Sequence, residues 1–281
     1  MNRARSSAFR LGRGLLAAAL ALGAMAPADR EHPGARTAPA AVRAPAGPVD
    51  RLFGQEVRRI PTSRRVVALT FNAAWDDGGV AEVLTVLRER RAPATFFPTG
   101  DFAERHPRAL RAMAARHGLG NHSHSHPLFD GLPRARVAEE VTRADRAIRA
   151  AAGAVPLPFF RFPFSATTPA GIAQVNDLGF ADIEFTTDTN GYLGPAGGMT
   201  VAKAVTRALA GLAPGHIVQM HVGSPGGGPV LDARALPAII DAVRARGYRI
   251  VDLRTLLGPA PGAPRSTGPG KARAPRGNGP G

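Results

Sequence analysis

Two patterns of hydrophobic and polar positions alternate between residues 61 and 258. Short apolar runs typical of buried strands occur seven times, and longer segments with helical spacing of apolar residues separate them. The predicted strands are VVALTF (66–71), ATFF (94–97), LGNHS (119–123), FFRF (159–162), ADIEFT (181–186), HIVQMH (216–221) and YRIVDL (248–253). Strands that alternate with helices in this way form a parallel sheet covered by its helices.

The segments between the strands predict six helices. They are 80–91 and segments near 106–116, 134–152, 168–178, 200–212 and 232–246. About 200 residues of this alternation fit a single-domain α/β fold, a small (β/α) barrel, and a doubly wound open sheet is the alternative. Both folds place the active site at the carboxyl ends of the strands, so polar residues there are the candidates for chemistry.

The two ends of the chain do not follow this alternation. Four arginines precede a short apolar run at 15–25, and small residues follow at 26–28. This order predicts a secretory signal peptide over 1–28, and an uncleaved anchor is the alternative. The apolar run is shorter than the roughly 20 residues of a comfortable membrane span. Residues 29–60 are expected to be a Pro/Ala/Arg-rich linker, and 259–281 a disordered basic tail.

Composition narrows the chemistry further. The chain has 281 residues, a formal net charge of +15 and no cysteine. Without cysteine there is no disulfide, and a metal site would have to use His, Asp, Glu or Asn. The basic excess reflects either a bias toward arginine or attraction to an anionic partner such as a cell-wall polymer. Because no nucleic-acid-binding module is visible, nucleic-acid binding is not expected.

The strongest candidate site is NHSHSHP (121–127), which follows a predicted strand. If the turn is helical, His122 and His126 are i, i+4 neighbours that can hold one ion, and if it is extended, His124 could face the same way. Neutral imidazole is a common ligand of zinc-like ions. The bland alternative is a solvated polar loop, which three histidines at this spacing disfavour.

Three further candidates lie at predicted strand ends. After the first strand, Asp76 and Asp77 could be a ligand and a base, although either could merely cap the following helix. Arg161, between two phenylalanines, needs a polar partner if it is buried and could orient an aspartate. His221 ends a strand, where it could donate a proton to a leaving group or be a satisfied core histidine.

Together these motifs resemble the polysaccharide deacetylases, the group with a NodB-type domain that includes chitin and peptidoglycan deacetylases. The resemblance covers residues 60–258 and rests on the order of five motifs: VALTFNAAWDDGG, NHSHSH, RFPF, TTDTNGY and IVQMHVG. It implies a distorted (β/α)7 barrel and a divalent metal cofactor, Zn²⁺ or a similar ion such as Co²⁺.

The resemblance also implies roles for individual residues. His122 and His126 match the metal-binding histidines, and His124 falls at a position that is not a ligand. Arg161 matches the arginine that orients the catalytic base, and His221 matches the general acid. Asp188 and Tyr192 match the fourth motif, in which an aspartate helps to position the acid and an aromatic residue lines the groove.

The first motif departs from the family pattern TFDDG. Without a gap, Asn72 takes the position of the base and Ala73 that of the metal ligand, yet an amide cannot accept a proton as a carboxylate does. In the other register, Asp76 and Asp77 restore the acidic pair four residues later. We therefore expect Asp76 to be the third metal ligand, Asp77 the base and Asn72 a nearby hydrogen-bonding group.

The resulting hypothesis is a secreted or wall-associated, monomeric hydrolase that removes N-acetyl groups from a polysaccharide such as peptidoglycan or a chitin-like glycan, without a membrane span after signal cleavage. An O-acetyl esterase is one alternative, and a catalytically impaired glycan-binding protein on the same fold is another. Candidate sugar-contacting aromatic residues are Trp75, Phe129, Phe164 and Tyr192, and each could equally belong to the core.

Overall fold

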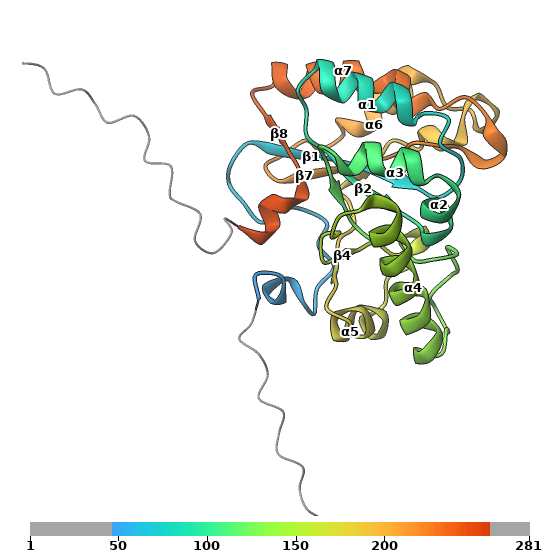
Figure 1. Ribbon diagram of the computed structural model, residues 1–281. Helices are drawn as coiled ribbons and strands as arrows, with labels where there is room; N and C mark the ends of the chain where they lie inside the picture. The colour runs from blue at the N-terminus through green and yellow to red at the C-terminus, as the bar shows by residue number, and fades with distance from the viewer. Residues whose placement is uncertain (1–46, 259–281) are drawn as a thin grey trace, which may run out of the picture. The chain divides into compact units, whose positions relative to one another are not determined.

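The computed structural model describes residues 47–258. The strands are β1 (Val66–Ala73), β2 (Thr95–Pro98), β3 (Gly118–Leu119), β4 (Phe159–Phe160), β5 (Ala181–Asp182), β6 (Thr187–Asp188), β7 (His216–His221) and β8 (Arg249–Val251). The helices are α1 (Val80–Glu89), α2 (Gly100–Arg105), α3 (Pro107–Ala114), α4 (Arg134–Ala152), α5 (Pro169–Asp177), α6 (Val201–Ala208) and α7 (Leu231–Ala245). Figure 1 shows their arrangement.

The strand pairings run around a distorted parallel barrel. One sheet has the order β3-β2-β1-β7-β6, with β8 also on β1, and β4 pairs with β5. A parallel bridge from Asn121 to Phe160 links the β3 segment to β4. The segment 181–188 pairs with β4 through β5 and with β7 through β6, so it joins the two sheets. The α/β fold and its parallel strands are therefore as predicted.

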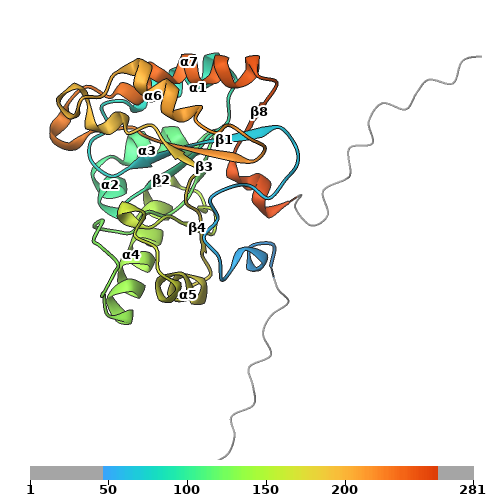
Figure 2. The ribbon, with the colours of Figure 1, turned by 180° about the vertical axis from the view of Figure 1, so that it is seen from behind.

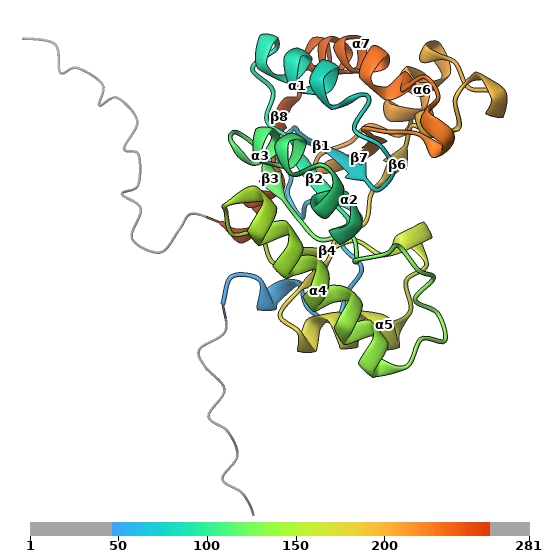
Figure 3. The ribbon, with the colours of Figure 1, turned by 45° about the vertical axis from the view of Figure 1, so that its right-hand side comes forward.

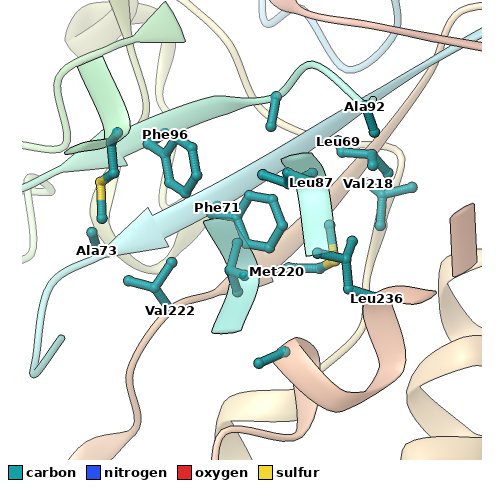
Figure 4. Packing of buried hydrophobic residues seen from close by; sticks show 14 of the residues in the cluster. Leu69, Phe71, Ala73, Leu87, Ala92, Phe96, Val218, Met220, Val222 and Leu236 are labelled. Carbon is teal, nitrogen blue, oxygen red and sulfur yellow. The ribbon is translucent and has the colours of Figure 1, made fainter. Parts of the chain in front are cut away.

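Helices cover the strands from two sides. α1, α6 and α7 lie together next to β1 and β7, and α4 and α5 lie on the other side of the strands (Figures 1 and 3). The main core forms between β1, its neighbouring strands and the first helix group. Figure 4 shows Phe71 and Phe96 at its centre, with ring centroids 5.1 Å apart. All eight residues of β1 are buried, as expected for a strand covered on both faces.

The predicted elements are largely present. All seven strand segments contain a strand, and the long helix is found at Arg134–Ala152 as expected, ending at Gly153 with φ of 66°. The third to fifth predicted strands are only two residues long, because their chains bend away to form the loops of the barrel mouth. Helix α2 was not predicted, and the Thr99 side chain caps it by accepting a hydrogen bond from the Phe102 N–H.

The predicted linker over 29–60 extends too far. Residues 47–60 belong to the fold, where Leu52, Val57 and Ile60 are buried in a second core cluster. Val57 bridges to Ile183, and this stretch lies beside β4 and α5 (Figure 2). The predicted linker was extended over this stretch although it carries three spaced apolar side chains. The predicted signal peptide, the rest of the linker and the basic tail lie outside the described residues.

Within residues 47–258, no helix combines the length and apolar character that a membrane crossing requires.

A chain that starts at residue 61 should be less stable than one that starts at residue 47. It loses the buried side chains of Leu52, Val57 and Ile60, and each such burial contributes about 1.5–3 kcal/mol. We expect the melting temperature to fall by at least about 10 °C, measured by circular dichroism. Equal melting temperatures for the two chains would mean that residues 47–60 add nothing to the fold.

Candidate active site

A pocket of about 180 Å³ opens at the carboxyl ends of the strands. The register brings its parts together, because β1 pairs Asn72 with His221 of β7 and with Phe97 of β2. The residues that line it are Asn72, Trp75, His122, His126, Phe162, Phe164, Ser165, Asp188, Tyr192, Gln219 and His221. Eight of the predicted site residues are among them, and each of the five sequence motifs contributes at least one residue to the lining.

A row of hydrogen bonds runs along the floor of this pocket. Arg161 Nη1 donates to Asn72 Oδ1 at 3.1 Å, and Asn72 Nδ2 donates to Gln219 Oε1 at 3.2 Å. Gln219 Nε2 then donates to Asp188 Oδ2 at 2.9 Å. A guanidinium can only donate and an ionised carboxylate can only accept. Arg161 at one end and Asp188 at the other therefore fix which way the amides of Asn72 and Gln219 point.

Arg161 is fully buried beneath the row. Its Nε donates to the Ile183 carbonyl at 2.9 Å and its Nη2 to the Glu184 carbonyl at 3.1 Å, while the guanidinium carbon lies 4.1 Å from the centre of the Phe97 ring. Burial lowers the pKa of Arg161 to about 10, against nearby carboxyl groups that raise it, so it stays charged near pH 7. The side chain that Arg161 orients is the Asn72 amide and not an aspartate.

His122 and His126 lie side by side on the pocket wall, with ring centroids 4.8 Å apart. His122 Nδ1 lies 2.8 Å from the Arg161 carbonyl oxygen. Since that oxygen can only accept, Nδ1 carries the proton and Nε2 keeps a free lone pair. Burial lowers the pKa of both histidines, and His126 adds to the effect at His122. Both rings are therefore neutral near pH 7, which is the form that binds metal ions.

His221 lies at the opposite wall between two aromatic rings. Its ring centroid is 5.4 Å from that of Trp75 and 4.5 Å from that of Tyr192. Burial, with the positive charge of Arg161 next in size, lowers the pKa of His221 to about 3. The imidazole is therefore neutral near pH 7.

Behind His221 lies a carboxyl group that the sequence analysis missed. Asp232, fully buried in the first turn of α7, accepts a hydrogen bond from the His221 backbone N–H at 2.8 Å, and its Oδ2 lies 3.9 Å from His221 Nδ1. A Cβ atom on Gly191 would lie 2.1 Å from Asp232 Oδ1, so glycine at 191 leaves the room for this carboxyl group. Asp188, predicted to position the acid, instead hydrogen-bonds Gln219 and the Asn190 N–H.

Asp76 and Asp77 do not reach the pocket. Asp76 accepts hydrogen bonds from the backbone N–H groups of Gly78 and Ser224, at 2.8 and 3.1 Å. Asp77 is half-exposed and pairs with His106 at 3.3 Å. Trp75 turns inward in their place, so the expected movement of Asp76 over the histidine pair does not occur. Within residues 47–258, no carboxylate completes a three-ligand set with His122 and His126.

The aromatic candidates divide between the pocket and the core. Phe164 is 68% exposed at the rim, where its ring packs edge-on against His126 at 4.7 Å. Its φ of 59° and that of Ser165, 52°, are both left-handed. Such strain in consecutive residues is typical of functional loops. Phe129, by contrast, is buried against Phe160 and Phe162, so it belongs to the core.

Comparison with known proteins agrees with this geometry. A family model described as polysaccharide deacetylase matches residues 59–183. A chitooligosaccharide deacetylase of Bradyrhizobium sp. (strain ANU 289) is 33% identical over 202 residues, which cover 68% of this chain and 90% of that protein. The chain belongs to the polysaccharide deacetylase family.

One further relative and one solved structure are similar to the chain. A peptidoglycan-N-acetylglucosamine deacetylase of Bacillus cereus is 26% identical over 70% of this chain and 70% of its own length. The crystal structure of a CE4-family pseudoenzyme from Bacillus anthracis matches with a TM-score of 0.66 and 23% identity, covering 73% of this chain and 69% of that one. At this identity, the second comparison supports the fold alone.

The structure distinguishes the two registers of the first motif. Asn72 is the penultimate residue of β1 and its amide accepts a hydrogen bond from Arg161, which is where the ungapped register places the base. Ala73 packs into the main core (Figure 4), so the ungapped ligand position offers no donor atom. The residues present therefore fit a divalent ion through two imidazoles, whereas the third protein ligand expected of a deacetylase is not supplied by this motif.

Asp232→Asn should change the pH dependence of stability. Burial raises the pKa of Asp232 to about 7 in the folded chain. A raised carboxyl pKa contributes stability that is present below the unfolded value and is lost as pH rises through the folded one. Asparagine does not titrate, so the parent chain alone loses this stability. The free energy of unfolding of Asp232→Asn relative to the parent should therefore grow between about pH 4 and pH 8, by on the order of a few kcal/mol at most.

The measurement is the denaturant midpoint of both chains across this range. The matched control is Asp241→Asn, which changes a half-exposed aspartate on the same helix. A difference between Asp232→Asn and the parent that does not vary with pH would contradict the assignment of a raised pKa.

Proposed function

We propose that the chain is an exported, metal-dependent deacetylase that removes N-acetyl groups from a cell-wall or extracellular amino-sugar polysaccharide. The observation that carries this proposal is the pocket in which His122, His126 and His221 face one another between aromatic walls. The relatives named as chitooligosaccharide and peptidoglycan-N-acetylglucosamine deacetylases favour a glycan that contains N-acetylglucosamine. The signal-like residues 1–28 support export, and the chain is proposed to act as a monomer.

His122 and His126 would hold the metal ion, zinc or a similar divalent cation. The hydrogen bond from His122 Nδ1 to the Arg161 carbonyl fixes the orientation of the ring, as outer partners commonly do for metal-bound histidines. The chemistry that such an ion supplies is polarisation of the acetyl carbonyl and activation of water.

His221 would handle the proton. Its imidazole is neutral near pH 7, so Nε2 can take a proton from the attacking water and then give it to the departing amine. Nδ1 faces Asp232, whose carboxyl group would stabilise the imidazolium that forms in between. In this sequence the carbonyl carbon–nitrogen bond breaks, and acetate and a free amine are the products.

The sugar would lie across the mouth of the pocket. Trp75 and Tyr192 pack against each other with ring centroids 5.4 Å apart and ring planes tilted by 31°, and the exposed Phe164 forms the opposite rim. Aromatic faces of this kind bury apolar sugar surface while the polar floor provides hydrogen bonds.

A second function is favoured by a single observation, which is the amide of Asn72 where a carboxylate base is expected. An amide cannot accept the proton of the attacking water. A chain of this kind would hold the glycan in the same pocket and release acetate slowly or not at all. Binding and hydrolysis must therefore be measured separately.

His126→Gln tests whether acetate release depends on a metal ion at the histidine pair. The change removes one imidazole ligand, so acetate release from acetylated chitooligosaccharide should fall by at least about a hundredfold, and chelator should lower the activity of the parent chain to the same level. The assay uses residues 29–281 with Zn²⁺ or Co²⁺. His106→Gln, a histidine change outside the pocket, is the control. Activity that survives both chelator and His126→Gln would rule out the metal at this site.

Asn72→Asp separates the two functions. It places a carboxylate 3.1 Å from the Arg161 guanidinium, and a positioned base contributes about 10²–10⁴-fold to rate. A glycan-binding chain with impaired catalysis should therefore gain acetate release by about a hundredfold or more. Asn176→Asp adds the same charge away from the pocket, where the Asn176 side chain contacts Gly54 and Phe180, and is the control. A parent chain that is already fast and gains nothing would show that catalysis does not use position 72.

The substrate arms distinguish the bond that is broken. Peptidoglycan and acetylated chitooligosaccharide present N-acetyl groups, and acetylated xylan presents O-acetyl groups. Release from xylan alone would replace the amidase proposal with the esterase. Retention of glycan, measured by affinity electrophoresis, without release from any substrate would leave the binding function.

A further inference from the structure

A second group of potential metal ligands lies outside the pocket, next to the loop that carries the histidine pair. Asp101 and Glu104 come from α2, one helical turn apart, and His124 comes from the loop. One oxygen of each carboxylate and one ring nitrogen of His124 all lie within 4.8 Å of one another. The resemblance gives His124 no role.

The geometry within this group is close to that of a bound ion. His124 Nε2 is 3.1 Å from Asp101 Oδ1 and 4.0 Å from Glu104 Oε2. Ligands held about 2.0–2.2 Å from a tetrahedral zinc ion lie roughly 3.3 Å from one another. Small side-chain rotations would therefore bring all three atoms to one centre.

His124 is an independent sign of a ligand. The side chain is 1% exposed, and neither ring nitrogen has a hydrogen bond of good geometry in the described structure. Nδ1 faces Gly100, where a Cβ would lie only 1.9 Å away. Nε2 is therefore the atom aimed at the carboxylates. Leaving a buried imidazole nitrogen without a partner is unfavourable.

The backbone fixes His124 before any ion arrives. The His124 N–H donates to Glu140 Oε2 at 2.9 Å, and the His124 carbonyl accepts from the Asp101 N–H at 3.0 Å. The imidazole can shift little, so the mobile ligands are the two half-exposed carboxylates. The nearest competing cation described is Arg143, whose Nη2 lies 4.0 Å from Glu104 Oε2, a distance at which an exposed pair contributes little.

We propose that Asp101, Glu104 and His124 form a second divalent-metal site that ties α2 to the histidine loop. One imidazole with two carboxylates suits zinc-like transition ions better than Ca²⁺ or Mg²⁺, which prefer oxygen ligands alone. Because two ligands are half-exposed, water would complete the coordination. The site stands independently of the proposed deacetylase activity, since none of its side chains lines the pocket.

The first experiment locates the ions. Crystals of the chain soaked in micromolar Zn²⁺ are measured at the zinc absorption edge. We expect an anomalous peak bonded to His124 Nε2 and to both carboxylates, separate from any peak at His122 and His126. A peak at the pocket pair alone, or none at either place, would overturn the second site.

The second experiment measures affinity with Zn²⁺ by calorimetry. Glu104→Gln should weaken one binding event by at least about tenfold and leave the other unchanged. Glu139→Gln is the matched control, because Glu139 is equally exposed and also pairs with an arginine. Equal binding by Glu104→Gln and Glu139→Gln would overturn the proposal. A parent chain that shows both zinc-binding events but releases no acetate would support the second site and contradict only the proposed function.

Discussion

The burial of one positive charge organises the candidate site. Arg161 has no exposed surface, and a buried guanidinium is tolerated only if its donors are satisfied. Its partners come from β1 and from the segment that begins with β5, so the requirement ties distant parts of the barrel together. The Arg161 carbonyl also orients His122. One residue thus fixes the pocket floor through its side chain and the ring orientation of His122 through its backbone carbonyl.

The pocket keeps most parts of a deacetylase while its first motif has changed. Two neutral imidazoles, a third at the opposite wall and an aromatic rim are all present. The carboxylates of the first motif have left the pocket, and Trp75 occupies the space of that loop. Chemistry here would therefore rest on histidines to a greater extent than the family pattern implies.

Some parts of this arrangement were predictable from the sequence and others were not. The strands and helices followed from buried apolar runs and helical spacing, because parallel barrels bury nearly every strand residue. The histidine pair, Arg161 and His221 were found because strand ends converge. The path of Asp76 was not predictable, since it depends on a backbone N–H of Ser224 that is 148 residues away. Asp232 at the start of α7 is indistinguishable in sequence from an ordinary acidic residue in the first turn of a helix.

The contact between Gly191 and Asp232 has an evolutionary consequence. Any side chain at 191 would overlap the Asp232 carboxyl group, so the two positions cannot change independently. A lineage that acquires a side chain at 191 must first lose the carboxyl group at 232, passing through a form in which nothing acidic stands behind His221. Position 191 should therefore accept a side chain when residue 232 is small and reject one while residue 232 is aspartate, so the effect of a change at 191 depends on the residue at 232.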